Sequence, residues 1–203
     1  MVKKAFQLKG FFFKLNRYFL WMNKKVILDN NHLNITLDRL ACQLSENHDD
    51  FKETILVGLQ PRGKSLCEKL LNILKDKYKI SSVKHGFLDI TFFRDDFRRN
   101  KDVLIPNETD FKLLVENKKV VFIDDVLYTG RTIRAALTAI ESFGRPKTIE
   151  LLILVDRRFS RELPIQPDYK GVQVDVYENQ KVNVKWDDVK DGNYVYIENL
   201  MNG

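Results

Sequence analysis

The sequence is poor in the residues that most often mark metal sites, disulfides and linkers. It has two cysteines, three histidines, five prolines and nine glycines in 203 residues. Cys42 and Cys67 lack the spacing of a metal or redox motif, and His32, His48 and His85 are too scattered for a ligand set. No uninterrupted apolar run is long enough to cross a membrane. These features predict a cytoplasmic protein whose two thiols are reduced core residues.

Positive charge is concentrated at the N-terminus. The net charge is +6, but seven cations precede the first acid, Asp29, and subtracting these seven from +6 leaves a charge of −1 for the rest. Bulk charge therefore gives no argument for nucleic-acid binding by the core. The first 21 residues mix aromatic and basic side chains and are too broken for a secretory signal. We expect an N-terminal basic-aromatic extension over residues 1–21, interpreted as an upstream mis-start, and one domain over residues 22–203; attachment of the extension to a membrane surface is the alternative.

Strand patterns alternate with helix patterns along the chain, which predicts a doubly wound, mostly parallel α/β sheet. Core strands are expected at residues 54–59, 87–92, 120–123 and 149–155. Helices are expected at residues 33–44, after the turn at 60–63, and after Thr132, where Ile133, Ala136, Leu137 and Ile140 share a face. Residues 94–117 are polar and irregular, as is typical of a functional lid or a mobile loop. The tail shows β-like alternation from residue 172 onwards, with a last strand at 194–197.

The most specific motif is the segment 120–132, in which an apolar strand is followed by Asp124 and Asp125, and then by a short turn into a helix. A helix N-terminus offers unpaired N–H groups to a phosphate, and Gly130 allows close approach of the backbone. Thr129 and Thr132 can donate hydroxyl hydrogen bonds, whereas the two carboxylates suit vicinal hydroxyls of a sugar. The pattern therefore predicts a site for a phosphorylated sugar, the alternative being an ordinary strand–turn–helix with a surface acidic pair.

This segment resembles the phosphoribosyl pyrophosphate (PRPP) signature of type I phosphoribosyltransferases, and it lacks the glycines and lysine of a Walker A loop. The resemblance implies that Asp124 and Asp125 hold the ribose and stabilise its positive charge in the transition state. The 5′-phosphate contacts that it implies come from the turn and the start of the helix: Tyr128, Thr129, Gly130, Arg131 and Thr132.

Two further loops are expected beside this one, because ligands of such sheets bind at the carboxyl ends of the strands. They cover residues 60–64 and 156–164. Arg62 and Gly63, at a helix start, are predicted to bind the pyrophosphate, with Mg²⁺ bridging pyrophosphate and ribose oxygens. Arg94 and Asp95, at the base of the long loop, fit a lid that excludes water and reaches the pyrophosphate, with Arg94 counted among the catalytic residues. The alternatives are a solvated helix-start cation for Arg62 and a charged loop edge for residues 94–96.

Most of the chain, from residue 22 to residue 198, resembles the PyrR family of pyrimidine operon attenuators with uracil phosphoribosyltransferase activity. The resemblance rests on order and spacing in the segments 26–29, 55–58, 88–91, 94–96, 124–132, 154–157, 161–165 and 196–198. It implies conversion of uracil and PRPP to UMP and pyrophosphate, with a uracil pocket under a small hood at residues 156–164. Asp156 and Arg157 are then the expected base contacts. It also implies a dimer or higher homo-oligomer and UMP-responsive binding of operon leader RNA, with Arg39 and Arg161 as RNA contacts.

The sequence departs from the family pattern at three places. Pro61 stands where the pyrophosphate loop usually has Thr, and Asp38 and Cys42 replace the usual neighbours of Arg39. The hood, at residues 156–162, is longer than the usual form, which has Gly-His between its Asp-Arg and Arg-Glu-Leu-Pro parts. Two alternatives therefore stay open: a phosphoribosyltransferase for another base without RNA regulation, and a nucleotide-sensing regulator with weak catalysis.

Overall fold

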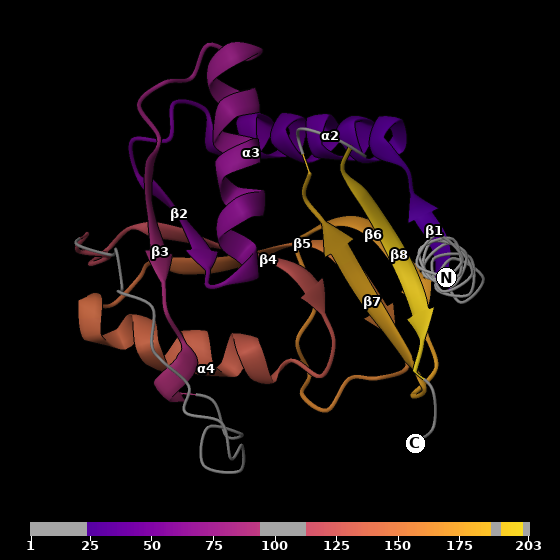
Figure 1. The fold of residues 1–203 in the computed structure, drawn as a ribbon. Helices are drawn as coiled ribbons and strands as arrows, with labels where there is room; N and C mark the ends of the chain where they lie inside the picture. The colour runs from indigo at the N-terminus through magenta and orange to yellow at the C-terminus, as the bar shows by residue number, and fades with distance from the viewer. Residues whose placement is uncertain (1–23, 94–112, 188–191, 201–203) are drawn as a thin grey trace, which may run out of the picture. The chain divides into compact units, whose positions relative to one another are not determined.

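The computed structural model describes residues 24–93, 113–187 and 192–200 (Figure 1). The chain forms two compact units, one from residues 34–175 and the other from residues 1–33 together with 176–203. The expected N-terminal extension lies outside the described residues, as do Arg94 and Asp95 of the expected lid.

The larger unit is built on a five-stranded sheet in which every neighbouring pair is parallel, in the order β3-β2-β4-β5-β6. This confirms the predicted doubly wound α/β class. The strands β2, β4 and β5 are neighbours in the sheet, so their carboxyl ends share one stretch of its edge. The five strands are β2 (Thr54–Leu59), β3 (Lys84–Leu88), β4 (Lys119–Leu127), β5 (Thr148–Arg158) and β6 (Tyr169–Asp175).

Helices cover both faces of this sheet (Figure 1). The helices α2 (Asn30–His48) and α3 (Arg62–Asp76) lie on one face, and α4 (Arg131–Ile140), followed by the short 3₁₀ helix η3 (Glu141–Phe143), lies on the other. The hydrophobic core between the sheet and α4 includes Val57, Phe122, Ile133, Ala136 and Ile153. Apolar periodicity in the sequence predicted these helices, because it places one stripe of side chains against the sheet.

The strand expected at residues 87–92 is shorter and begins earlier, as β3 ends at Leu88. Asp89 ends it, because its Oδ1 accepts hydrogen bonds from the backbone N–H and hydroxyl of Thr91, at 2.8 and 2.5 Å. Such side-chain to backbone bonds compete with strand pairing and favour turns. The chain then enters the 3₁₀ helix η1 (Thr91–Phe93).

Two other strands run further than expected, and one apolar side chain faces outward. The strand β4 continues through Asp124 and Asp125, where it stays paired with β5. The strand β5 continues through Asp156, which pairs with β4, and through Arg157, which pairs with Val174 of β6. In α4 the small Ala135 and Ala139 are buried whereas Leu137 is exposed, so the predicted position of Leu137 on the core face was wrong.

The smaller unit contains a separate antiparallel sheet with strand order β1-β8-β7. It consists of β1 (Lys24–Leu28), β7 (Gln180–Lys185) and β8 (Tyr194–Asn199). The sequence predicted a β-like tail but not its pairing with β1. The first strand of that expected tail is β6, which belongs to the parallel sheet instead.

Both cysteines are free; Cys42 is half-buried and Cys67 is buried. Burial raises the pKa of the Cys67 thiol to about 12, as expected for a reduced core residue. His48 is also buried, where it contacts Thr54, Tyr169 and Glu150.

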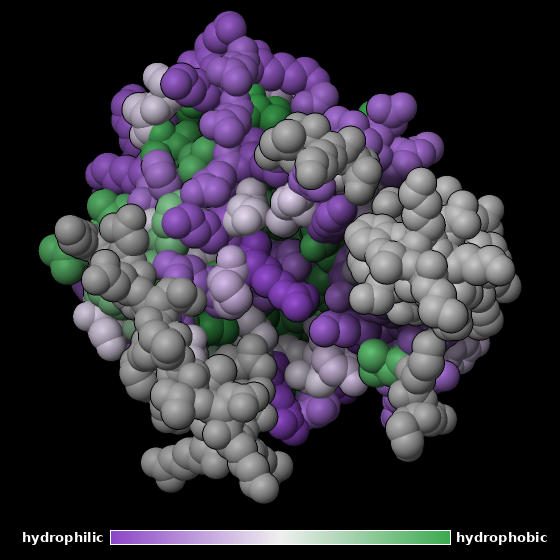
Figure 2. Space-filling view, in the orientation of Figure 1, coloured by the Kyte–Doolittle hydropathy of each residue, from purple (hydrophilic) through white to green (hydrophobic). Residues whose placement is uncertain are grey.

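In the part of the chain that the structure describes, no helix is long and apolar enough to cross a membrane. The face shown in Figure 2 is mostly hydrophilic, with hydrophobic residues in small separate areas.

Candidate active site

The acidic pair lies at the carboxyl end of β4 and is withdrawn from solvent, with exposed fractions of 7% for Asp124 and 4% for Asp125. Adjacent strand residues point to opposite faces of a sheet. Phe122 packs in the core beside α4, so Asp124 belongs to the α4 side and Asp125 to the α3 side. Burial raises the pKa of Asp125, and the positive charge of Arg62 opposes that shift. The Oδ1 of Asp124 accepts a hydrogen bond of 2.9 Å from the backbone N–H of Asp125.

The first turn of α3 lies directly against this strand. A Cβ atom at Gly63 would come within 2.2 Å of the carbonyl oxygen of Ile123, so only glycine fits there. Arg62 opens the helix and is exposed, after a cis bond between Gln60 and Pro61. The structure therefore brings the predicted pyrophosphate loop to the acidic pair, as the sequence predicted from the carboxyl-end rule.

The predicted phosphate loop joins β4 to α4. Gly130 precedes the helix with φ of +94°, a left-handed conformation that suits glycine. Its Cα faces the hood, since a Cβ atom there would lie 3.2 Å from Ile165 and 3.3 Å from Leu163. Tyr128 and Arg131 are exposed, and Thr129 and Thr132 are half-buried. The N-terminus of α4 is thus available to an anion at the carboxyl edge of the sheet.

The hood loop is bonded to the phosphate loop through its residues 161–163. The carbonyl oxygen of Thr129 accepts hydrogen bonds from the N–H groups of Glu162 and Leu163, at 3.0 and 3.2 Å. The guanidinium of Arg131 forms an ion pair with Glu162, whose Oε2 lies 2.7 Å from Nε and 2.6 Å from Nη2. Arg161 donates to the carbonyl oxygen of Tyr128 at 2.5 Å. These bonds connect the predicted base-binding loop to the predicted phosphate loop.

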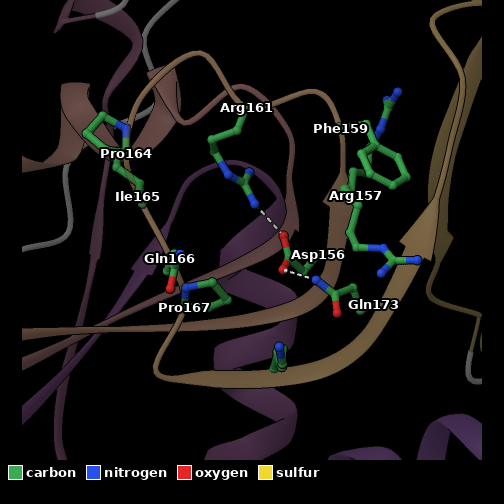
Figure 3. Close-up of a pocket in the computed structure, with 11 residues that line it drawn as sticks. Asp156, Arg157, Phe159, Arg161, Pro164, Ile165, Gln166, Pro167 and Gln173 are labelled. Carbon is green, nitrogen blue, oxygen red and sulfur yellow. Dashed lines mark hydrogen bonds and ion pairs between the residues drawn. The ribbon is translucent and has the colours of Figure 1, made fainter.

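A pocket of about 470 Å³ opens beside the hood. In Figure 3 Asp156 lies between Arg161 and Gln173. Its Oδ1 accepts a hydrogen bond from Arg161, and its Oδ2 accepts one from Gln173. Pro164 and Pro167 belong to one wall, and further lining comes from residues 157–159, Ile165, Gln166 and Lys170. The volume is in the range of small-molecule sites, and the lining combines a few apolar side chains with several charged ones.

Arg157 is buried at the end of β5, and its guanidinium carbon lies 4.0 Å from the centre of the Tyr128 ring. Burial lowers the pKa of this guanidinium. Stacking on an aromatic face is a favourable arrangement for a partly desolvated arginine. The two predicted base contacts, Asp156 and Arg157, thus both lie in the pocket wall, and one of them also touches the phosphate loop.

The two residues expected to contact RNA make bonds within the larger unit. Arg39 donates from Nη2 to the carbonyl oxygens of Lys170 and Gly171, at 3.1 and 2.5 Å, although its side chain is exposed. Arg161 is mostly enclosed by its contacts with Asp156 and Tyr128.

Asp89 was not predicted as a site residue. It lies just beyond β3, whose last residue, Leu88, accepts a hydrogen bond of 3.0 Å from the N–H of Gln60 in the pyrophosphate loop. Its Oδ2 is buried and makes no hydrogen bond within the described residues. A buried carboxylate oxygen of this kind is costly unless something donates to it. The sequence signal that could have identified Asp89 is an acid at the end of a strand, the same signal that identified Asp124.

A sequence model of the phosphoribosyl transferase domain matches residues 23–188 of this chain. The fold and this match define the class as phosphoribosyltransferase. Among curated relatives, Bifunctional protein PyrR of Caldicellulosiruptor bescii is 40% identical over 178 residues, covering 87% of this chain and 96% of that protein. Bifunctional protein PyrR of Haemophilus ducreyi is 42% identical over 162 residues, covering 80% and 89%. The chain belongs to the PyrR family.

Solved structures agree with the fold. A hypoxanthine phosphoribosyltransferase from Staphylococcus aureus superposes with a TM-score of 0.61 at 19% identity, covering 87% of this chain and 92% of that one. The hypoxanthine phosphoribosyltransferase of Trypanosoma cruzi gives 0.64 at 14% identity, covering 87% and 97%. At such low identity these likenesses concern the fold alone.

Proposed function

We propose that this protein transfers the ribose 5-phosphate group of PRPP to uracil, forming UMP and pyrophosphate, and that it also regulates pyrimidine genes by UMP-responsive binding of leader RNA. The observation that carries the catalytic part is the meeting of three loops at one edge of the parallel sheet, with Gly63 packed against the strand of the acidic pair. The relatives' name, Bifunctional protein PyrR, agrees with an activity of two parts.

In this proposal the loop before α4 binds the 5′-phosphate through Tyr128, Thr129, Gly130, Arg131 and Thr132. The N–H groups at the start of the helix and the left-handed Gly130 support that assignment, because the backbone donors at a helix N-terminus favour an anion. Arg131 is paired with Glu162, so an entering phosphate would compete with that carboxylate for the guanidinium.

Asp124 and Asp125 are proposed to hold the ribose hydroxyls and to stabilise the positive charge that develops on the ribose ring. Their burial supports this role, because a charge in a water-poor site acts more strongly on the reacting atoms. The bond between the anomeric carbon and pyrophosphate breaks as the bond to uracil N1 forms, and N1 loses its proton. Arg62 and Gly63 are assigned to the leaving pyrophosphate, with Arg94 and Asp95 of the lid assigned beside them.

Magnesium is the proposed cofactor, held through PRPP with Asp124 and Asp125 nearby. The donor chemistry fits, since Mg²⁺ keeps several waters and takes few protein oxygens when substrate phosphates are present. Within the described ranges no three His, Cys, Asp or Glu side chains are grouped to hold a metal ion by themselves. When bound, the ion would neutralise charge on the pyrophosphate.

Uracil is proposed to bind in the pocket beside the hood, where Asp156 and Arg157 contribute to the wall. Arg161 and Gln173 hold Asp156 in place, so this carboxylate is positioned before a ligand arrives. A second candidate, transfer to another base, is favoured by one observation: the hood is longer than the usual family form and exposes Phe159 at the pocket.

The test of the enzymatic part is PRPP- and Mg²⁺-dependent conversion of uracil, in parallel with hypoxanthine, adenine and orotate. UMP formation with little turnover of the other three bases is expected. Turnover of another base with none of uracil would support the second candidate, transfer to that base, in place of uracil. Turnover of none would favour a nucleotide-sensing regulator with weak catalysis.

The regulatory part is proposed to use leader RNA, with Arg39 and Arg161 as contacts, in a cytoplasmic homo-oligomer of two or more copies. The free thiols agree with a reducing compartment. Filter binding of pyrimidine-operon leader RNA with and without UMP tests it, and sedimentation gives the number of copies. Affinity that is the same with and without UMP would contradict the regulatory part without affecting the enzymatic one.

A further inference from the structure

Phe159 is the most exposed aromatic side chain at the pocket. It lines the pocket, yet 85% of its surface is open to solvent. Its φ is +64°, in the left-handed region that a bulky residue adopts only under constraint. Exposed apolar surface and local backbone strain at the same residue of a binding pocket are both frequent marks of function.

The loop that carries Phe159 is fastened on both sides. On one side Arg158 forms a two-pronged ion pair with Asp175 of β6, at 2.5 and 2.6 Å. On the other, Arg161 contacts Asp156 and Tyr128. The strained backbone of Phe159 is therefore held in position by bonds that do not involve its ring.

One face of the Phe159 ring already has a partner. The guanidinium carbon of Arg158 lies 5.2 Å from the ring centre, and Asp175 holds that guanidinium in place. This stack of carboxylate, guanidinium and ring supports the phenyl group from behind, while most of the ring stays exposed. A ring supported in this way is suited to receive a second planar group on its open side.

The rest of the pocket indicates what kind of planar group that is. Apolar surface at Pro164, Ile165 and Pro167 lies beside polar groups that include the carboxylate of Asp156 and the carboxamide of Gln173 (Figure 3). The pocket is also lined by four cations: Arg157, Arg158, Arg161 and Lys170. Flat apolar surface combined with hydrogen-bonding groups matches a heterocycle that has donors and acceptors on its edge. A heterocycle of this kind can lay its face on the Phe159 ring and direct its edge to the polar side chains.

We propose that Phe159 is a specificity-determining residue whose ring stacks on the nucleobase of the substrate and of the nucleotide product. The proposal rests on the phosphoribosyltransferase function proposed above, and it assigns the added length of the hood to base binding. The ring contacts the base and not PRPP, so its loss is expected to change the KM for the base and not the KM for PRPP.

The experiment compares Phe159→Ala, Phe159→Tyr and the control Tyr177→Ala, which removes an aromatic side chain that is 75% exposed and does not line the pocket. For each, KM is measured for uracil and for PRPP, and UMP binding is measured by calorimetry. Phe159→Ala is expected to raise the uracil KM and the UMP Kd by about 5- to 30-fold, the lower part of the range for base–aromatic stacking, since the ring lies at the rim. In Phe159→Ala the KM for PRPP is expected to stay within about twofold of the wild-type value. Phe159→Tyr is expected to have the uracil KM and UMP Kd of the wild type, and Tyr177→Ala is expected to change none of the three constants.

Unchanged uracil KM and UMP Kd in Phe159→Ala would overturn the proposal while leaving uracil transfer intact. If the wild-type protein turns over a different base, a selective rise in the KM of that base upholds the stacking role and overturns only the choice of uracil. A wild-type protein that neither binds UMP nor turns over any of the four bases overturns both proposals. Equal melting temperatures for the variants exclude unfolding as the cause of a rise.

Discussion

At the residue scale, Asp125 combines a raised pKa with a proposed catalytic role. Burial makes its ionised form costly, and the attraction of Arg62 offsets only part of that cost. A carboxyl whose pKa is higher in the folded protein than in the unfolded chain destabilises the fold when ionised. Stability therefore falls as pH rises from the unfolded value, near 4, through the raised folded value.

Replacing Asp125 by Asn is accordingly expected to lower turnover and raise stability at once. Loss of one electrostatic contact in a transition state costs about 2.7–4 kcal/mol, or roughly 10²- to 10³-fold in kcat. The free energy of unfolding, measured in urea at pH 7, should exceed that of the wild type, and the gain should vanish as pH falls below the raised pKa of Asp125.

A matched control for that prediction is Asp175→Asn. The hydrogen bond from Arg158 lowers the pKa of Asp175, so its stabilising contribution is present above the unfolded pKa and is lost as pH falls. The two substitutions should thus change stability at pH 7 in opposite directions. A destabilised Asp125→Asn variant would show that the carboxylate of Asp125 is stabilised in the fold.

The backbone angle and surroundings of Gly130 also predict an effect of substitution on stability and on PRPP binding. An L-residue with a Cβ atom pays about 1–2 kcal/mol in the left-handed region, and contact with Leu163 and Ile165 adds crowding. Gly130→Ala is expected to lower the free energy of unfolding by at least that amount and to raise the KM for PRPP.

Gly130→Asn separates the two causes, because asparagine tolerates the left-handed region but still carries the crowding Cβ atom. Urea denaturation should place this variant between the wild type and Gly130→Ala. If Gly130→Ala were as stable as the wild type, neither the backbone angle nor the hood contact would constrain this position.

At the scale of elements, α2 is joined to the starts of three strands by a buried polar network. His48 contacts Thr54 of β2 at 3.1 Å and the Tyr169 hydroxyl of β6 at 3.2 Å. That hydroxyl donates to Glu150 of β5 at 2.6 Å and accepts from Asn47 at 3.1 Å. Desolvation lowers the pKa of His48 despite the attraction of Glu150. The network thus joins elements at the amino ends of the strands, the edge opposite the proposed site.

A histidine whose pKa is lower in the folded state keeps the fold stable while it is neutral. Stability is therefore expected to decline as pH falls below the ordinary histidine pKa of about 6.5, with a slope of at most about 1.4 kcal/mol per pH unit for one proton. Urea denaturation between pH 5 and 8 measures this slope. His48→Gln should flatten it. An unchanged slope in His48→Gln would assign the pH dependence to other groups.

At the scale of the whole molecule, we propose that the phosphoribosyltransferase domain begins at residue 22. The domain match starts at residue 23, and β1 pairs with β8 from Lys24 and Glu198 onwards. Removal of residues 1–21 is expected to leave turnover within about twofold and the melting temperature unchanged, because no described strand pairing is lost.

Removal of residues 1–28 is the matched control, since it also deletes β1. The strand β8 then loses its pairing with β1 and exposes an edge, so a lower melting temperature and aggregation are expected. Loss of activity on removal of residues 1–21 alone would contradict the proposed domain boundary and assign a role to the extension.

Short-range chemistry in the sequence determined the class and the outline of the site. Apolar runs and helical stripes predicted the strands and helices of the parallel sheet, and the carboxyl-end rule brought Arg62, Asp124 and Asp156 to one edge. These features depend on residues close together in the chain, where periodicity and turn chemistry are visible. The end of β3 shows the limit, because the side chain of Asp89 redirected the backbone there.

The tertiary structure alone decided the contacts between residues far apart in sequence. Examples are the pairing of β1 with β8, the hydrogen bond from Arg161 to the carbonyl oxygen of Tyr128, and the ion pair of Arg158 with Asp175. No local pattern carries such pairings, because each depends on where the packed sheet holds the two backbones. For the same reason, the pKa of Asp125 follows from burial and from the position of Arg62, and from neither residue type alone.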